Sequence, residues 1–421
     1  MLSIVLAGVT SAFAAIIYSE FAAMIPISGS AYTYAYATLG ELIAWIIGWD
    51  LILEYAVGNV AVAIGWAGYF DSLMRGLGVD LPRWLVTDLR TALADPALLA
   101  AAPHLGPIPI VFNAPALLIV ALVTLVLVRG VKESSWVNTL MVAIKLAVIA
   151  LFLVVGLKYL KPGLWHTPTF APNGIKGISV GAAIIFFSYI GFDAVSTASE
   201  EAKNPQRDIP IGIIASLIIC TVLYIAIALV LTGLIPWDQL DVPDPLAVAL
   251  QYIHADWASL LLAAGAVAAM TSVLLVFQMG QPRIFMSMAR DGLLPPWAAK
   301  LHPKYRTPHV TTILTGVFVG VSAAFAPIGW VLELTNIGTL FAFILVAIGV
   351  IMLRRTEPDR PRPFRTPWVP VLPLASVAFC LYLMFQLPLL TWIRFGLWMA
   401  IGSAIYFLYG VRHSRVRASS R

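Results

Sequence analysis

Long apolar stretches recur along the whole chain, and short polar or charged segments separate them. A helix needs about 20 mostly apolar residues to cross the ~30 Å hydrocarbon layer of a membrane. We therefore expect an all-α polytopic membrane protein, with one transmembrane domain over residues 1–421. The pattern predicts eleven spans, at 2–24, 39–70, 114–131, 136–160, 177–198, 209–235, 257–281, 309–327, 331–353, 369–390 and 393–411.

The composition supports a membrane protein and predicts its orientation. Hydrophobic residues make up 60% of the chain and charged residues 11%, whereas about 25% of a soluble domain is charged. Basic side chains concentrate on the side of the membrane that faces the cytoplasm. Of the 26 Lys and Arg residues, 18 fall in five of the segments between or after spans, at 128–135, 199–208, 282–308, 354–368 and 412–421. We expect these segments and the C-terminus to be cytoplasmic, and the net charge of +5 to reflect topology, with no nucleic-acid partner.

The odd number of spans raises a question about the start of the chain. With a cytoplasmic C-terminus, eleven crossings place Met1 outside, where no basic flank precedes the first apolar stretch. A signal peptide at 1–30 is one explanation, but its apolar run is too long and has no positive leading segment. We expect instead that a first transmembrane helix lies upstream and is absent from this sequence.

One lysine is predicted to lie deep in the membrane. Lys145 is about ten residues from the cytoplasmic end of the span 136–160, which places it ~15 Å deep. An ionisable group at that depth is costly and marks a functional candidate. Lys145 is predicted to carry a proton, or to be a fixed cation where a metal ion would sit. The alternative is a structural amine bonded to backbone carbonyls of a neighbouring helix.

Two carboxylates share one face of the second span. Asp50 and Glu54 are four residues apart, so a helix brings them to the same side. They form a candidate coupled proton site, and a buried structural role is the alternative. Glu333 and Arg394 lie near span ends, where their charges can reach the membrane surface, so we assign them no functional role.

The fifth span contains residues that are unfavourable in an uninterrupted lipid-facing helix. Ser188, Gly191 and Asp193 lie within an otherwise apolar run, and Ser188 is predicted near the middle of the membrane. A helix unwound there exposes carbonyls that suit an ammonium group, and such backbone survives only where it lines a cavity or binds a ligand. The alternative is a continuous helix in which the glycine permits close packing.

The remaining motifs exclude the common enzyme classes. Both cysteines, Cys220 and Cys380, fall in apolar spans, and no spacing of Cys and His resembles a zinc site. No glycine-rich phosphate loop and no Gly-x-Ser-x-Gly motif is present. We expect no enzymatic activity, no cofactor and no bound metal.

Several ordered motifs together resemble a known family. Phe187-Ser-Tyr-Ile-Gly-Phe-Asp193, followed by Glu200-Glu-Ala-Lys-Asn-Pro-Gln206, is similar to the sixth-helix signature of amino acid permeases. The resemblance is to the amino acid–polyamine–organocation superfamily, in its cationic amino acid transporter branch. Further agreement comes from Pro26-Ile-Ser-Gly-Ser-Ala-Tyr-Thr-Tyr34, Gly48-Trp-Asp-Leu-Ile-Leu-Glu-Tyr55, Gln281-Pro-Arg-Ile-Phe285 and Thr335-Asn-Ile-Gly-Thr-Leu-Phe-Ala-Phe343.

The resemblance implies a fold and a site. It implies a five-plus-five inverted repeat with two peripheral helices, whose substrate lies between two broken helices. Phe187 matches an aromatic residue that closes over substrate, and Lys145 matches a lysine standing where sodium-coupled relatives hold an ion; Thr271 and Ser272 border that ion region. The family's first helix, which holds the substrate carboxylate, has no match in this sequence. The implied substrate-binding residues are Phe187, Ser188, Tyr189, Ile190, Gly191 and Phe192.

We therefore expect a secondary active transporter that moves amino acids across the cell membrane by alternating access, coupled to protons. The alternative is a transport-inactive fragment, or a sensor that binds amino acids without moving them. A cytoplasmic gate at 200–210 is a further hypothesis, with a simple surface loop as its alternative. The sequence leaves open whether the substrate is cationic or neutral, whether transport is symport or exchange, and the oligomeric state.

Overall fold

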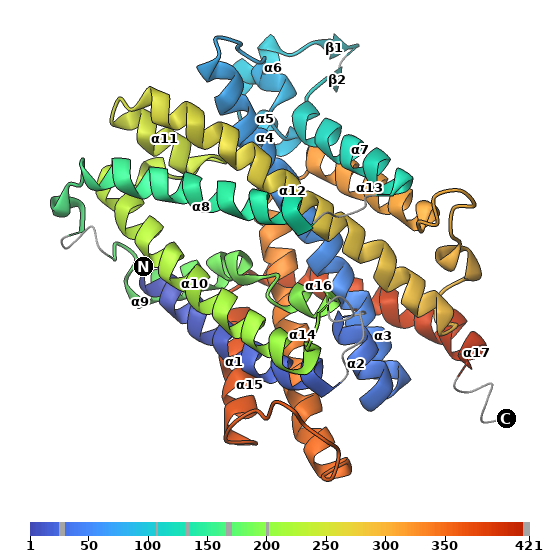
Figure 1. Cartoon of the computed structure of the whole chain (residues 1–421). Helices are drawn as coiled ribbons and strands as arrows, with labels where there is room; N and C mark the ends of the chain where they lie inside the picture. Colours follow the sequence, from blue (N-terminus) through green and yellow to red (C-terminus); the bar gives the residue numbers. More distant parts are fainter. Residues whose placement is uncertain (25–29, 107, 131–134, 166–170, 199–201, 416–421) are drawn as a thin grey trace.

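The computed structural model describes residues 1–24, 30–106, 108–130, 135–165, 171–198 and 202–415, and these are mainly helical (Figure 1). The helices that coincide with predicted spans are α1 (Leu2–Met24), α3 (Glu41–Ile52), α4 (Gly58–Gly76), α7 (Ala114–Arg129), α8 (Ser135–Leu157), α9 (Gly174–Ile185), α10 (Pro205–Leu234), α12 (Asp256–Arg290), α13 (His309–Phe325), α14 (Ile328–Thr356), α15 (Val371–Phe385) and α16 (Leu389–Ile405). The shorter helices are α2 (Ser30–Thr38), α5 (Leu89–Leu93), α6 (Pro96–Ala101), α11 (Pro245–Tyr252) and α17 (Val411–His413).

Irregular helical segments join or interrupt these elements. Two π-helices, η1 (Leu53–Val57) between α3 and α4 and η8 (Tyr406–Gly410) between α16 and α17, keep their neighbours continuous. Short 3₁₀ helices are η2 (Arg83–Leu85), η3 (Pro162–Trp165), η4 (Phe186–Tyr189), η5 (Asp193–Ala198), η6 (Trp237–Gln239) and η7 (Pro296–Ala299).

Each of the eleven predicted stretches is occupied by helix. Among the described residues, eight helical segments are long and apolar enough to cross a membrane, and α7, α13 and α15 are shorter apolar helices. The polar segment 71–113, between the second and third predicted spans, contains several short elements. There α4 extends to Gly76, and Asp88 and Asp95 accept hydrogen bonds from backbone amides at the starts of α5 and α6. A small antiparallel pair, β1 (His104–Leu105) with β2 (Ile108–Pro109), completes this region.

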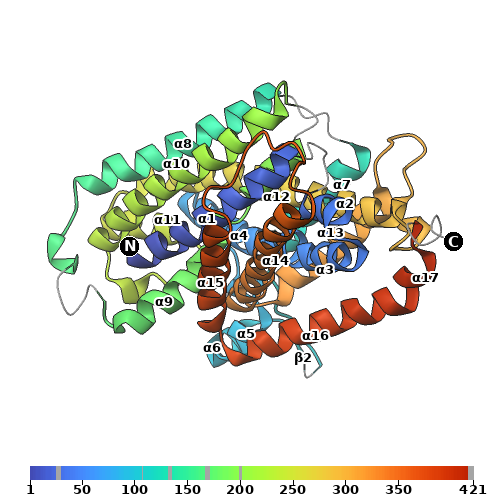
Figure 2. The same ribbon diagram turned by 90° about the horizontal axis from the view of Figure 1, so that it is seen from below.

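The helices differ in how deeply they lie in the bundle. The continuous segment α3–η1–α4 and the helix α14 run through the centre and are mostly buried, whereas few residues of α8, α10 and α16 are buried (Figures 1 and 2). Helices that are apolar all round are typical of proteins whose outer surface faces lipid. At Gly265 a side chain would collide with Val148, so this glycine permits the close approach of α12 to α8.

The short helix α2 is attached to the end of α12. The hydroxyl of Tyr32 donates a hydrogen bond of 2.6 Å to the Asp291 carboxylate. Burial raises the pKa of Asp291, although this hydrogen bond acts in the opposite direction. The contact joins two segments that both lie at the predicted cytoplasmic side.

Candidate substrate and coupling site

The predicted interruption is present between α9 and η5. The regular helix ends at Ile185, η4 follows, and the backbone then leaves the helical region at Ile190, with φ −64° and ψ 136°. Gly191 has φ 114°, a conformation that residues with a side chain rarely adopt. The glycine in this span is therefore used for a backbone turn, and the continuous helix that was the alternative interpretation is wrong.

Polar side chains from two neighbouring helices hold the carbonyls before the turn. The Nδ2 atom of Asn336, on α14, donates to the carbonyl oxygens of Ala183 and Ile184 at 2.8 and 3.0 Å. The Tyr224 hydroxyl, on α10, donates to the carbonyl of Ser188 at 2.6 Å. These donors provide hydrogen bonds near the point where the helical ladder stops, and so make the interruption tolerable inside a membrane.

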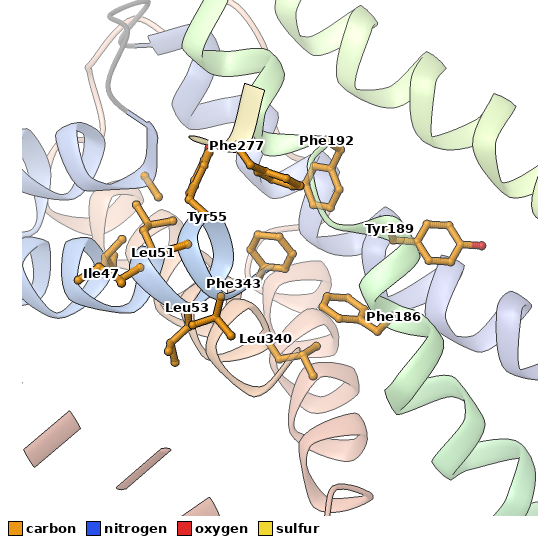
Figure 3. Close-up of a cluster of buried hydrophobic side chains, with 14 of the residues drawn as sticks. Ile47, Leu51, Leu53, Tyr55, Phe186, Tyr189, Phe192, Phe277, Leu340 and Phe343 are labelled. Atoms are coloured by element: carbon orange, nitrogen blue, oxygen red, sulfur yellow. The ribbon is translucent and has the colours of Figure 1, made fainter. Parts of the chain in front are cut away.

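Aromatic rings pack around the interruption (Figure 3). Phe192 lies beside Phe343 of α14, with ring centroids 5.1 Å apart, and Phe277 of α12 meets Tyr55 of η1 at 5.7 Å. The Tyr189 ring points away from this cluster, and its hydroxyl donates to the carbonyl of Ile4 on α1 at 3.1 Å. Four helices that are distant in sequence thus converge on the turn.

A cavity of about 320 Å³ borders the turn. It brings together five of the six predicted substrate-binding residues with Lys145 of α8 and Ser272 of α12. Its other described lining comes mainly from α10 and α12. The lining residues are Lys145, Ser188, Tyr189, Ile190, Gly191, Phe192, Ala194, Val195, Ser216, Leu217, Cys220, Tyr224, Ser272, Val273, Val276 and Phe277.

Phe187 and Thr271, which the resemblance places at or near the site, do not line this cavity. Phe187 points toward the start of α4, where a carbon of its ring would lie 3.8 Å from a side chain added at Gly58. Thr271 accepts a hydrogen bond of 3.0 Å from the Trp66 indole and donates to the carbonyl of Val267. Thr271 therefore faces α4, while its neighbour Ser272 faces the cavity.

A second group of polar side chains lies buried behind the turn. The carboxylates of Asp50, Glu54 and Asp193 are each 1% exposed. Asp193 and the hydroxyl of Thr339 lie beside Glu54, and Asp50 lies against Gly338 of α14. Both oxygens of Asp50 and of Glu54 are without a hydrogen-bond partner of good geometry. Among the ion pairs of the described residues, none involves these three carboxylates.

This acidic group extends what the sequence predicted. The spacing of Asp50 and Glu54 indicated a pair on one helix face, and the structure adds Asp193 from η5 next to Glu54. The roles of Asn336 and Tyr224 at the turn were not predicted from the sequence. A single Asn in a strongly apolar helix was the available signal, because an unpaired amide in a membrane is costly.

The remaining candidates have simpler surroundings. Glu333 accepts a 2.5 Å hydrogen bond from Thr391, and the Arg394 guanidinium lies 4.0 Å from the centre of the Trp330 ring. Both cysteines are free thiols. Within the described ranges, no group of His, Cys, Asp and Glu could hold a metal ion. Glu200 and Glu201, at the start of the hypothetical gate, lie outside the described residues.

Comparison with known proteins places this architecture in a family. The family described as "Amino acid permease" matches residues 1–407. The methylthioribose transporter of Bacillus subtilis is 46% identical over 98% of this chain and 86% of its own length. The branched-chain amino acid permease BcaP of the same organism is 45% identical over 99% of this chain and 86% of its own length. The vacuolar cationic amino acid transporter 4 of Arabidopsis thaliana is 39% identical over 85% of this chain and 58% of its own length. The chain therefore belongs to the amino acid permease family of multi-pass membrane transporters.

Proposed function

We propose that this protein is a proton-coupled secondary transporter that moves neutral amino acids with aliphatic side chains across the cell membrane. The observation that carries the proposal is the cavity beside the helix interruption, which combines backbone turned out of the helix, one amine and apolar walls. Alternating access would expose this cavity to each side in turn. The predicted orientation, with a cytoplasmic C-terminus, and the cell membrane as location belong to the same proposal.

The lining of the cavity supports a neutral substrate. Among the described lining residues, Lys145 is the one charged side chain, and no acidic residue is present to balance a cationic side chain. An unpaired charge in a membrane cavity is strongly disfavoured. Two relatives are named for branched-chain amino acids and for methylthioribose, and both names denote substrates without a cationic side chain.

The proposed coupling uses two ionisable sites. Lys145 borders the cavity and has no ion-pair partner among the described residues. Glu54 and Asp193 lie beside each other and do not line the cavity, and one proton shared between them would relieve the repulsion of two buried charges. Protonation of either site changes the charge next to the interruption, and this supplies a physical link between proton binding and substrate binding.

Uptake by the purified protein in lipid vesicles tests the proposal. Radiolabelled leucine, isoleucine and valine should accumulate when the vesicle lumen is alkaline relative to the outside, and arginine and lysine should not. Failure to take up any of the twenty amino acids, with or without the gradient, contradicts amino acid transport. Binding without uptake would support the alternative of an amino acid sensor.

Variants of one helix test the coupling. Lys145→Ala should reduce the stimulation of uptake by a pH gradient more than it reduces substrate binding. Lys158→Ala, at an exposed position directly after the same helix, is the matched control and should behave as the unaltered protein. An unchanged response to pH in Lys145→Ala would remove Lys145 from the mechanism.

Methylthioribose is a second candidate substrate. Hydroxyl groups of Ser188, Ser216, Ser272 and Tyr224 line the cavity and could bind a sugar. Competition decides between the candidates: excess unlabelled methylthioribose should leave leucine uptake unchanged if the protein is an amino acid carrier, and should abolish it if the sugar is preferred.

A further inference from the structure

Two arginine side chains from different helices converge on one tryptophan. The guanidinium carbon of Arg394, on α16, lies 4.0 Å from the centre of the Trp330 ring at the start of α14. The guanidinium carbon of Arg90, on α5, lies 4.5 Å from the centre of the same ring. The two positive charges are therefore no further apart than the sum of these distances. We call these three residues the arginine–tryptophan cluster.

No acid of the protein neutralises the two guanidinium groups. Among the ion pairs of the described residues, none involves Arg90 or Arg394. Asp88 accepts hydrogen bonds from backbone amides at the start of α5, and Glu333 of α14 accepts one from the Thr391 hydroxyl. Two positive charges held close together without a counter-charge repel each other, and a bound anion relieves that repulsion.

The donors of the cluster can be reached from outside the protein. Arg90 is exposed, Arg394 is partly exposed, and Trp330 is 40% exposed. A guanidinium carries five N–H donors in a planar fork whose geometry matches phosphate, and stacking on an aromatic face leaves these donors free at the edge of the group. The cluster therefore presents two such forks to a ligand at the surface.

The surroundings of Arg394 identify the surface as lipid-facing. Leu390, Ile393 and Leu397 recur at helical spacing beside it and are 52%, 51% and 61% exposed. An exposed apolar face on a helix that crosses a membrane contacts acyl chains. A phosphate bound at the cluster would thus have room for acyl chains directly next to it.

The cluster lies at the level of the head groups. The helices α14 and α16 both lead to segments that we predict to be cytoplasmic, so their starts lie at the outer side. Trp330 is the third residue of α14, and Arg394 is about 8 Å along α16 from its first residue. Tryptophan is enriched at this depth, where its ring meets the polar head groups.

We propose that the arginine–tryptophan cluster binds the phosphate of an anionic phospholipid in the outer leaflet. Arg90 and Arg394 donate hydrogen bonds to the phosphate oxygens, and the Trp330 ring holds both guanidinium groups in place. The acyl chains lie along the exposed apolar face of α16. This site is separate from the proposed transport function, and it does not depend on which substrate is carried.

Photo-crosslinking of the whole protein in vesicles made mainly of phosphatidylcholine tests the site. The probe is phosphatidylglycerol with a diazirine near the start of one acyl chain. We expect mass spectrometry to find the label on residues 389–401 of α16. Excess unlabelled phosphatidylglycerol should compete, and excess phosphatidylcholine, which has no net charge, should not. Label confined to other regions, or equal competition by the two lipids, overturns the proposal.

Inorganic phosphate distinguishes a lipid head group from a free anion. Labelling in phosphate buffer should equal labelling in chloride of the same ionic strength, because free phosphate has no acyl chains to place against α16. A loss of labelling in phosphate alone would show that the cluster binds a soluble anion, and this outcome would overturn the assignment to a lipid.

A matched pair of charge variants isolates the contact. Arg394→Gln should lower the labelling of α16 about fivefold, as expected when one positive charge beside an anionic head group is lost. Arg83→Gln removes an exposed arginine from the same outer segment as Arg90, and Arg83 does not contact Trp330. Its labelling should be unchanged. Equal labelling of the Arg394→Gln and Arg83→Gln proteins contradicts the site.

The second arginine gives an independent test at a position where folding is not at risk. Arg90 is exposed, so Arg90→Gln should unfold at the original temperature in detergent. Its labelling should also fall about fivefold. Undiminished labelling of the folded Arg90→Gln protein would show that the two arginines do not act on one phosphate, and the proposal would fail.

Discussion

Two buried acidic sites in this protein differ in how they are partnered. Glu20 on α1 is 1% exposed and is bound by Arg354 through two hydrogen bonds of 2.9 and 2.8 Å. It also lies 3.3 Å from Arg362 and accepts from the backbone amide of Thr366 at 2.7 Å. Glu54 is equally buried, yet neither of its oxygens has a hydrogen-bond partner of good geometry.

The difference separates a structural acid from a candidate functional one. Removing a carboxylate from water costs several kcal/mol, and the cost is offset only when counter-charges and donors replace the water. Glu20 has both, so its charge joins α1, α14 and the segment after α14 into one unit. Glu54 has a second acid, Asp193, beside it, so its uncompensated site is suited to gaining and losing a proton.

The largest expected effect comes from breaking the partnered site. Arg354→Met leaves the Glu20 carboxylate buried with weaker compensation, and we expect a loss of about 3 kcal/mol in stability. Thermal unfolding in detergent should show a clearly lower midpoint. Arg355→Met, at the exposed neighbouring position, should unfold at the original temperature. A normal midpoint for Arg354→Met would mean that Arg362 alone compensates Glu20.

Neutralising each acid should give opposite results. Glu20→Gln loses hydrogen bonds between charged groups and should cost about 2 kcal/mol. Glu54→Gln removes an uncompensated charge, so its unfolding temperature should be unchanged or higher, while the stimulation of uptake by a pH gradient should fall. The comparison fails if both variants are destabilised alike, or if Glu54→Gln keeps full pH dependence.

The turn that positions Asp193 can be tested through its backbone. Gly191→Ala places a side chain at φ 114° and should cost about 1–2 kcal/mol through strain alone. The same change at Gly396, in an open position of α16, should be neutral or slightly stabilising. Substrate uptake should decline in the first variant only. Equal behaviour of the two variants would show that this backbone conformation is unimportant.

The smallest expected effect concerns the hydroxyl that holds the turn. Tyr224→Phe removes the donor to the Ser188 carbonyl, and water in the adjacent cavity can replace it, so the loss should be about 1 kcal/mol. A modest rise in the Michaelis constant for uptake should accompany it. Tyr159→Phe, at an exposed site, is the control and should change neither quantity.

The chain's own pattern determined the helices and the position of the interruption. Apolar stretches of sufficient length, and a glycine within a membrane-depth segment, are local properties that act wherever the helices finally pack. The sequence also singled out Lys145 and the residues 188–192, which the structure places around one cavity. The family membership agrees with the resemblance of the motifs, whereas the roles of these residues in substrate and proton binding stay predictions.

Only the tertiary structure decided which distant side chains meet. Glu54 and Asp193 come from separate helices, as do Asn336 and the carbonyls of α9 that it binds. The same holds for Glu20 and Arg354. Periodicity specifies the face of a helix on which a residue lies, but the packing of all the helices sets the neighbour of that face. Whether a buried charge is compensated therefore cannot be predicted from the local sequence around either partner alone.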